Sequence, residues 1–323
     1  MARHLFIADP IEALDPRRDT TVAMIETARR RGHTTYIAAP LDLSIDESGP
    51  WCRVAEIVVR PAQLVDEHWV VDDIWYAVGE PERRALADFA SVSMRVRPPV
   101  DRAYLNATFI LDHADLGTAV VNRSAGLRVA NEKTFAIHTP EILPPTVVTA
   151  DRSELADFTR RQGRAVLKPL DGSPGRGVHQ LRPDDPNLRA IIDTATEGGR
   201  VQVIAQGFGS ATDDVGDRRV LVLDGEPIGS FARLTGGDDV GGDTGAEAME
   251  RADEPDEVVH MICERLAPFL TRLGLHVVGL DVIGDRLTEV NVAAPTGARQ
   301  ILRFGGVDVA DRYVEFLEGQ GWN

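Results

Sequence analysis

The stretch VGLDVIGDRLTEVNV, residues 278–292, decides the fold because it reads as two β-strands joined by a tight turn. The turn residues are Gly284-Asp285, a strong signal for a two-residue hairpin. With this turn Asp281 lies roughly opposite residue 288, so Glu289 is a near neighbour. Glu289 and Asn291 are two apart and share one face of their strand. Oxygen ligands converging from one hairpin suit Mg²⁺, and the alternative is a polar face turned to solvent.

An earlier hairpin has the same form. Arg219–Leu223 turns at Asp224-Gly225 into Pro227–Arg233. Arg219 and Arg233 could face one site from antiparallel strands, where guanidinium groups neutralise charge on a transferred phosphate. A solvated basic edge is the alternative. A helix over 254–273, closed by Gly274, is predicted between the two hairpins.

Lysine occurs at only two positions, Lys133 and Lys168, among 35 basic residues. Ammonium and guanidinium groups are not interchangeable at a phosphate, so these lysines could reach one anionic cofactor; the alternative is a compositional accident. Lys133 stands at the start of a predicted helix over 133–137. Lys168 ends a predicted strand before the glycine-rich loop Asp171–Gly177. Backbone N–H groups of such a loop can wrap phosphates, although a plain surface turn is the alternative.

The opening of the chain predicts a parallel sheet. Strands are expected over 4–8 and 35–39, with a helix over 20–31 between them. No Gly-x-Gly-x-x-Gly fingerprint of dinucleotide binding follows the first strand. At 323 residues, two or three packed units are expected.

Charge and cysteine content limit the partners. The net charge of −16 argues against nucleic acid. No apolar run approaches a membrane span, and residues 1–10 do not read as a signal peptide. Cys52 and Cys263 have no metal-binding spacing and suit a reducing compartment. We therefore expect a cytoplasmic protein without nucleic-acid or membrane partners.

Taken together, the segments 131–133, 167–172, 219–227 and 278–292 resemble the bacterial-type glutathione synthetases of the ATP-grasp superfamily. Asp9-Pro10, Met94-Arg95, Pro98-Pro99 and residues 295–297 also fit, in the same order along nearly the whole chain. The resemblance implies an α/β fold. An N-terminal parallel-sheet domain over 1–126 would precede a two-part ATP-grasp fold, with a small domain over 127–204 and a C-terminal domain over 205–323.

The resemblance also implies the chemistry. A substrate carboxylate would attack the γ-phosphate of ATP to form an acylphosphate, and an amine would then displace the phosphate, leaving ADP and a new peptide bond. The implied substrates are γ-glutamylcysteine and glycine, the cofactors are ATP and two Mg²⁺ ions, and a homodimer or homotetramer is expected. Catalysis would consist mostly of positioning and charge neutralisation.

Roles follow residue by residue from the resemblance. The nucleotide would be bound by Lys133, Lys168, Asp171, Gly172, Gly175, Gly177 and the hinge Gln206, Gly207 and Phe208. Arg219 and Arg233 would be the catalytic, phosphate-holding arginines, and Asp281, Glu289 and Asn291 would hold the metal ions. The substrate side would involve Asp19, Arg95, Arg97, Asp238, Asp239, Pro295, Thr296 and Gly297.

The chain departs from the family pattern on the substrate side. The segment 235–247 has no arginine where the family carries one to bind its substrate, and is acidic instead. Arg97 stands where the family has an acidic residue, and Ala293-Ala294 stand where it often has Thr-Ser. A γ-glutamyl or amino-acid ligase of specialised metabolism with altered substrates is therefore the alternative. A catalytically inactive nucleotide-binding protein is a more remote one, which the intact Asp281, Glu289 and Asn291 argue against.

Overall fold

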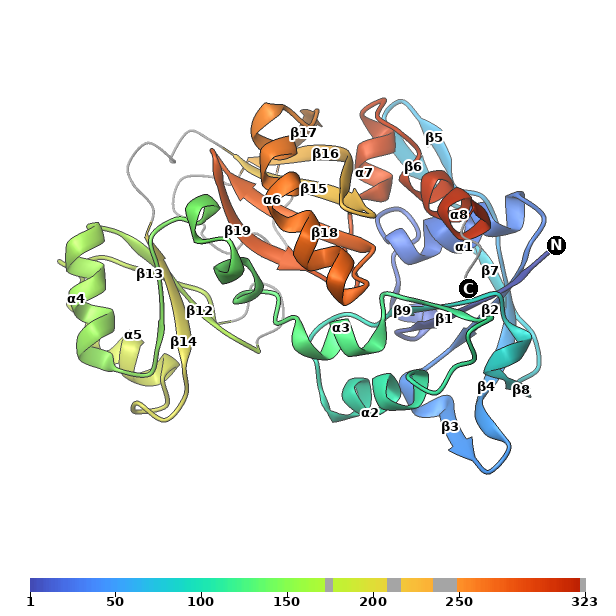
Figure 1. Cartoon of the computed structure of the whole chain (residues 1–323). Helices are drawn as coiled ribbons and strands as arrows, with labels where there is room; N and C mark the ends of the chain where they lie inside the picture. The colour runs from blue at the N-terminus through green and yellow to red at the C-terminus, as the bar shows by residue number, and fades with distance from the viewer. Residues whose placement is uncertain (172–176, 208–215, 235–248, 320–323) are drawn as a thin grey trace.

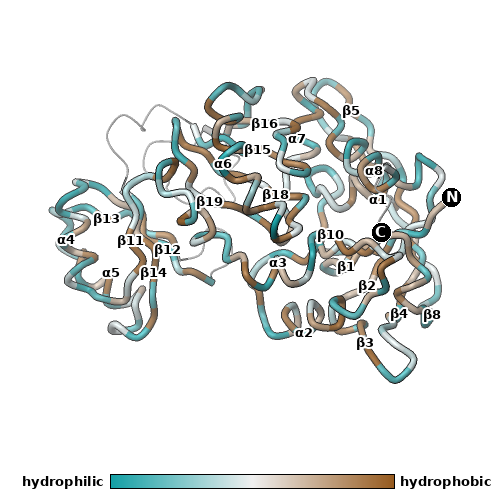
Figure 2. The backbone as a smooth tube through the Cα atoms, viewed as in Figure 1, coloured by the Kyte–Doolittle hydropathy of each residue, from teal (hydrophilic) through white to brown (hydrophobic). Residues whose placement is uncertain are grey.

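The computed structural model describes residues 1–171, 177–207, 216–234 and 249–319. Three sheets follow one another across the molecule, as Figure 1 shows. An N-terminal sheet lies at one end, beside both chain termini, a small sheet lies at the other end, and a third sheet lies between them. Figure 2 shows apolar residues along strands such as β12 (Ala165–Pro169), β14 (Val203–Gly207) and β18 (Val277–Ile283). None of the helices in the described ranges is long and apolar enough to cross a membrane.

The N-terminal sheet is mixed: the predicted parallel arrangement is confirmed for four of its eight strands, and the other four pair antiparallel. Its first strand, β1, pairs in parallel with β2 and β9, and β9 with β10. The strands of this sheet are β1 (Arg3–Ala8), β2 (Thr34–Ala38), β3 (Leu43–Asp46), β4 (Gly49–Val59), β7 (Tyr76–Val78), β8 (Glu82–Ala85), β9 (Ser91–Arg95) and β10 (Ala119–Val121). A separate hairpin joins β5 (Gln63–Val65) to β6 (His68–Val70). Because parallel strands end at one edge, Ala8 and Arg95 lie side by side there.

Helices cover this sheet from both ends of the chain. Helix α1 (Thr20–Arg30) begins at Asp19, whose carboxylate caps it by accepting the backbone N–H groups of Thr21 and Val22. The C-terminal helix α8 (Val309–Gly319) packs on α1, sharing a core of Tyr313 and Val314 with it. The remaining helices near this sheet are α2 (Arg102–Leu111) and α3 (Ser124–Val129).

The small sheet is antiparallel, in the order β11-β14-β12-β13. Its strands are β11 (Thr146–Thr149), β12 (Ala165–Pro169), β13 (His179–Leu181) and β14 (Val203–Gly207), and its helices are α4 (Arg152–Gln162) and α5 (Leu188–Ala195). Leu155 and Phe158 of α4 pack with Leu167 of β12 in a core of their own. Lys168 follows Leu167, so this core fixes the strand that carries the lysine.

The central sheet contains both predicted hairpins, in the order β17-β16-β15-β18-β19. Its strands are β15 (Asp217–Leu223), β16 (Glu226–Leu234), β17 (Met249–Asp253), β18 (Val277–Ile283) and β19 (Arg286–Asn291). Helix α6 (Glu257–Leu273) begins three residues later than predicted, because the Asp256 carboxylate accepts the backbone N–H of Val259 and caps it there. Gly274, with φ of +64°, ends the helix as predicted. The short helix α7 (Ala298–Arg303) follows this sheet.

Two local predictions need correction. The helix predicted over 133–137 is absent: the Asn131 side chain accepts the N–H groups of Lys133 and Thr134, both at 3.1 Å, and forms a turn instead. Short 3₁₀ helices follow, over Phe135–His138 and Pro140–Ile142; the others are Ile11–Ala13, Pro40–Asp42 and Leu86–Asp88. In the β18–β19 hairpin a register shift between Asp281 and Val282 places Glu289 directly opposite Asp281. The two carboxylates are therefore closer in register than the turn alone predicts.

Candidate active site

The two lysines meet at one carboxylate. Lys133 Nζ lies 3.9 Å from Glu289 Oε1, and Lys168 Nζ lies 3.8 Å from Glu289 Oε2. Lys133 comes from the turn before the 3₁₀ helices, Lys168 from the end of β12 and Glu289 from β19. Both separations exceed hydrogen-bond length. Each ammonium group is therefore attracted to Glu289 by its charge without forming a hydrogen bond to it.

The position of Lys133 follows from its two preceding residues. Glu132 Oε1 accepts the N–H groups of Val292 and Ala293, at 2.9 and 3.1 Å. Burial raises the pKa of Glu132, and these hydrogen bonds oppose that effect. Asn131 donates from its side chain to Leu170 O at 2.9 Å. The turn is therefore tied both to the end of β19 and to the loop after Lys168; neither anchor was predicted, although both residues belong to the quoted motif.

A second cluster surrounds Asp281. Arg219 donates to both carboxylate oxygens, from Nε at 2.6 Å and Nη2 at 3.2 Å, and Arg233 Nη2 donates at 3.0 Å. Asn291 Nδ2 donates to the same carboxylate at 3.0 Å. Burial alone would raise the pKa of Asp281, but the charges of Arg219 and Arg233 outweigh it and hold that pKa below its ordinary value. The two arginines thus face one site, as expected from their strands.

Asp217 belongs to this cluster and was not predicted. It lies opposite Arg233 in the sheet and accepts a short hydrogen bond from Arg233 Nη2. Burial and the neighbouring charge of Asp281 raise the pKa of Asp217. A signal was present in the sequence: Asp217 is two residues before Arg219, so both point to one face of β15.

The donors of this cluster fit a hard divalent cation. Asp281 and Glu289 offer carboxylates, and Asn291 offers an amide oxygen. No group of three His, Cys, Asp or Glu able to hold a metal occurs within the described ranges. A cation here would therefore take its remaining oxygens from phosphate and water, which is how Mg²⁺ is usually held.

The predicted substrate-side residues link the N-terminal and central sheets. Arg95 is buried and donates from Nη2 to Pro295 O at 2.8 Å. Arg219 Nη1 lies 3.4 Å from Thr296 O, and Gly297 N donates to Thr20 Oγ1 at 3.1 Å. The segment 295–297 therefore connects the edge of the parallel sheet to the arginine cluster.

Two other substrate-side predictions have evident structural uses. The Asp19 carboxylate is engaged as the cap of α1. Arg97 Nε donates to Asp9 Oδ2 at 2.8 Å, so Arg97 is paired with the carboxylate that follows β1.

The predicted nucleotide hinge ends β14. Gln206 Nε2 donates to Thr288 O at 3.3 Å, beside Glu289, and Gly207 N donates to Pro145 O at 2.8 Å. Asp171 is exposed, and Gly177 has φ of +71°. The predicted residues Gly172, Gly175, Phe208, Asp238 and Asp239 lie outside the described residues.

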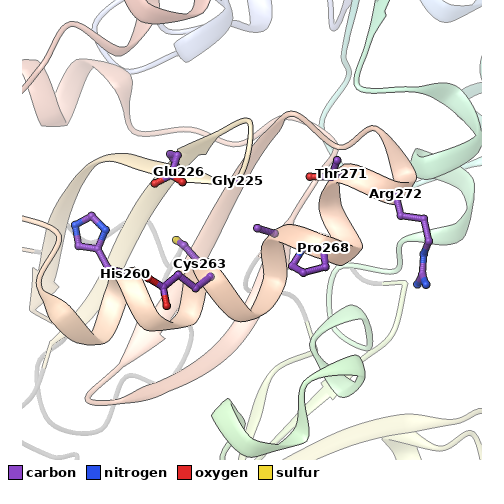
Figure 3. A pocket seen from close by; sticks show the side chains of 9 residues that line it. Gly225, Glu226, His260, Cys263, Pro268, Thr271 and Arg272 are labelled. Carbon is purple, nitrogen blue, oxygen red and sulfur yellow. The ribbon is translucent and has the colours of Figure 1, made fainter.

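A large hollow lies elsewhere, between α6 and the β15–β16 turn. It measures about 610 Å³ and is lined by α6 and the β15–β16 turn, as Figure 3 shows. Cys263 borders it, but burial raises the pKa of that thiol to about 12, so it is no nucleophile at neutral pH. The charged chemistry, and not the size of this hollow, marks the candidate active site.

Comparison with known proteins decides the family. The family model for the prokaryotic glutathione synthetase N-terminal domain matches residues 2–128, and the model for the ATP-grasp domain matches residues 132–306. The chain belongs to the prokaryotic glutathione synthetase family. Its relatives include the glutathione synthetases of Thermosynechococcus vestitus, 42% identical over 97% of this chain and 98% of that protein, and of Synechococcus elongatus, 40% identical over 97% of each.

Solved structures show the same fold at lower identity. The D-cycloserine synthetase DcsG superposes with a TM-score of 0.64 at 17% identity, over 98% of this chain and 99% of that one. The ATP-grasp ligase PsnB, complexed with a minimal precursor, gives 0.62 at 19% identity, over 98% of each chain. The ATP-grasp fold predicted from the sequence is confirmed. This glutathione synthetase family member is an ATP-dependent, ADP-forming carbon–nitrogen ligase, of a family that uses ATP and a divalent metal.

Proposed function

We propose that this ligase joins γ-glutamylcysteine to glycine and so makes glutathione. The observation that carries the proposal is the meeting of Lys133 and Lys168 at Glu289, beside the arginine-bound Asp281. Ammonium groups, which bind nucleotide phosphates, and carboxylates, which bind metal ions, thus lie together at one place. The name of the relatives, glutathione synthetase at 36–42% identity over nearly full length, supports the choice of substrates.

The proposed roles rest on the family resemblance, and the geometry supports them. Lys133 and Lys168 hold the nucleotide phosphates, and the hinge at Gln206 and Gly207 lies against the base. Asp281, Glu289 and Asn291 hold Mg²⁺, for which we propose two ions. Bound Mg²⁺ neutralises phosphate charge and aligns the transferred group.

The residues of this chain then act by position and charge. The substrate carboxylate attacks the γ-phosphorus, forming a P–O bond while the bond to ADP breaks. The amine next attacks the acyl carbon and forms the C–N bond. The bond between that carbon and the bridging oxygen breaks, and this oxygen leaves as part of inorganic phosphate. Arg219 and Arg233 neutralise the phosphate charge in the first step. Arg219 also contacts Thr296, so the proposed substrate-side segment 295–297 adjoins an arginine that we expect to hold the phosphate.

The Arg97–Asp9 pair favours a second candidate. It places an arginine, and not an acidic residue, beside the edge of the parallel sheet. A ligase with a different donor carboxylate or acceptor amine is the function this change suggests.

Product analysis separates the two candidates. ADP release and product mass are measured with Mg²⁺ and ATP in parallel arms. One arm contains γ-glutamylcysteine and glycine, and the others pair glutamate or γ-glutamyl peptides with different amino acids. Glutathione in the first arm supports the proposal; ligation only in another arm rejects it in favour of the second candidate.

Three further predictions complete the proposal. We place the domain limits at 1–126, 127–204 and 205–323; the first of these limits lies near the junction of the two family matches, at residues 128 and 132. We also propose a cytoplasmic location and a homodimer or homotetramer.

A further inference from the structure

Asp217 is a carboxylate of the site to which the proposed chemistry gives no role. It begins β15, and its Oδ2 accepts the short hydrogen bond from Arg233 Nη2. Its Oδ1 is buried and accepts no hydrogen bond from the described residues. A buried acceptor without a donor is unfavourable, because it has lost its hydrogen bonds to water without replacing them. Such an atom at a functional site suggests a partner in another state of the protein.

Among the described residues, Arg233 is shared between the carboxylates of Asp217 and Asp281. Nη2 contacts Asp217 Oδ2 and also lies 3.0 Å from Asp281 Oδ1. Asp281 has little room left: Arg219 donates to both of its oxygens, and Asn291 donates to Oδ2. A cation that coordinates Asp281 must therefore replace at least one guanidinium N–H.

We propose that Asp217 is a positioning residue that retains Arg233 when a metal ion takes Asp281. The inference rests on the proposed metal role of Asp281. A carboxylate with a vacant oxygen can accept a guanidinium through two parallel hydrogen bonds. Asp217 can thus accept Arg233 fully, which releases Asp281 to the metal and keeps the arginine beside the phosphates.

Removing the charge of Asp217 tests this competition. In Asp217→Asn the neutral amide binds a guanidinium poorly, so Arg233 remains on Asp281. We expect the affinity for Mn²⁺, measured by electron paramagnetic resonance at saturating ADP, to fall about tenfold. Asp217→Glu keeps the carboxylate and is expected to retain affinity within about twofold.

A matched control lies on the same sheet. Asp253 on β17 accepts a hydrogen bond at 2.9 Å from Arg218, the residue after Asp217. Asp253→Asn removes a comparable carboxylate–arginine pair from the other face of β15 and should leave Mn²⁺ affinity unchanged. An equal loss in this variant would overturn the inference, because it would show a general effect on the sheet.

The arginine supplies the decisive comparison. Arg233→Met removes the competitor for Asp281, so it should strengthen Mn²⁺ binding, and adding Asp217→Asn in that background should change nothing. Equal weakening by Asp217→Asn with and without Arg233, or no strengthening in Arg233→Met, would overturn the inference. Absence of Mn²⁺ binding by the wild-type protein would instead reject the metal site itself and the inference with it.

Discussion

Glu289→Gln should make metal-free ADP bind more tightly while it abolishes most ligation. Glu289 is the carboxylate to which both lysines are attracted, at 3.9 and 3.8 Å. A nucleotide must draw Lys133 and Lys168 away from it. The amide variant keeps the size of the side chain but removes the charge that holds the lysines.

The magnitude follows from the separations and the burial. At an effective dielectric constant of about 20, two unit charges near 4 Å attract by about 4 kcal/mol. These side chains are 10–19% exposed. Because neither contact reaches hydrogen-bond length, solvent screening leaves a net contribution of about 0.5–1 kcal/mol per pair. Releasing two lysines then corresponds to roughly a 5- to 30-fold increase in ADP affinity.

Calorimetric titration of ADP in the presence of EDTA measures this change. Asp285→Asn is the matched control: Asp285 lies on the same hairpin, is two-thirds exposed and, within the part of the chain that the structure describes, pairs with Arg286 at 3.3 Å. It should leave ADP affinity unchanged. With Mg²⁺ and ATP, ligation by Glu289→Gln should fall about 100-fold or more, because a metal ligand is lost. Weaker or unchanged metal-free ADP binding would refute the idea that Glu289 holds the lysines in the ligand-free site.

Three other substitutions test the site and the scaffold. Lys168→Arg keeps the charge but should lose most ligase activity, about tenfold or more, because a planar guanidinium does not replace an ammonium group at a phosphate; full activity in the ADP-release assay would contradict this. Burial, aided by the nearby His33, lowers the pKa of His4 to about 4. In the unfolded chain this histidine has an ordinary pKa near 6.5. Between about pH 4 and 6.5 it is therefore protonated in the unfolded chain and neutral in the folded one. The stability from this group is complete above about pH 6.5 and falls by about 3 kcal/mol as the pH drops to about 4; urea unfolding of His4→Gln should lack this loss, and an identical pH profile would argue against it. Glu26→Gln breaks the buried ion pair with Arg299, whose side chains are 7% and 5% exposed, and should cost about 3–5 kcal/mol in urea unfolding, whereas the exposed Glu315→Gln should cost under about 0.5 kcal/mol.

The hairpins were predictable because their signals are local. Gly284-Asp285 and Asp224-Gly225 specify tight turns without help from the rest of the chain. The register of the β18–β19 hairpin was not predictable in the same way. The shift between Asp281 and Val282 inserts an extra residue, and the turn type alone does not reveal it. The consequence for the site is direct, because this shift places Glu289 opposite Asp281.

Contacts between distant segments were the least predictable. Residues 40–90 form six of the strands described here, many of them exposed and with weak alternation, and the sequence predicted no element among them. The helix predicted over 133–137 failed because Asn131 offers the backbone a competing set of hydrogen bonds. The roles of Glu132 and Asp217 depend on partners 160 and 16 residues away. Such pairs follow from tertiary packing and not from local pattern.

The charge balance of the site explains why metal and nucleotide belong together there. The two lysines, Arg219 and Arg233 face three carboxylates, those of Asp217, Asp281 and Glu289. Partly buried charges of either sign are costly without partners. A metal ion alone would bind the carboxylates and leave the lysines and arginines without partners. A nucleotide alone would bind the lysines and arginines, and its phosphates would lie next to unpaired carboxylates. A metal–nucleotide complex supplies both signs at once, so every charged group exchanges one partner for another. We therefore expect metal and nucleotide to bind with positive coupling, each increasing the affinity for the other by the same factor.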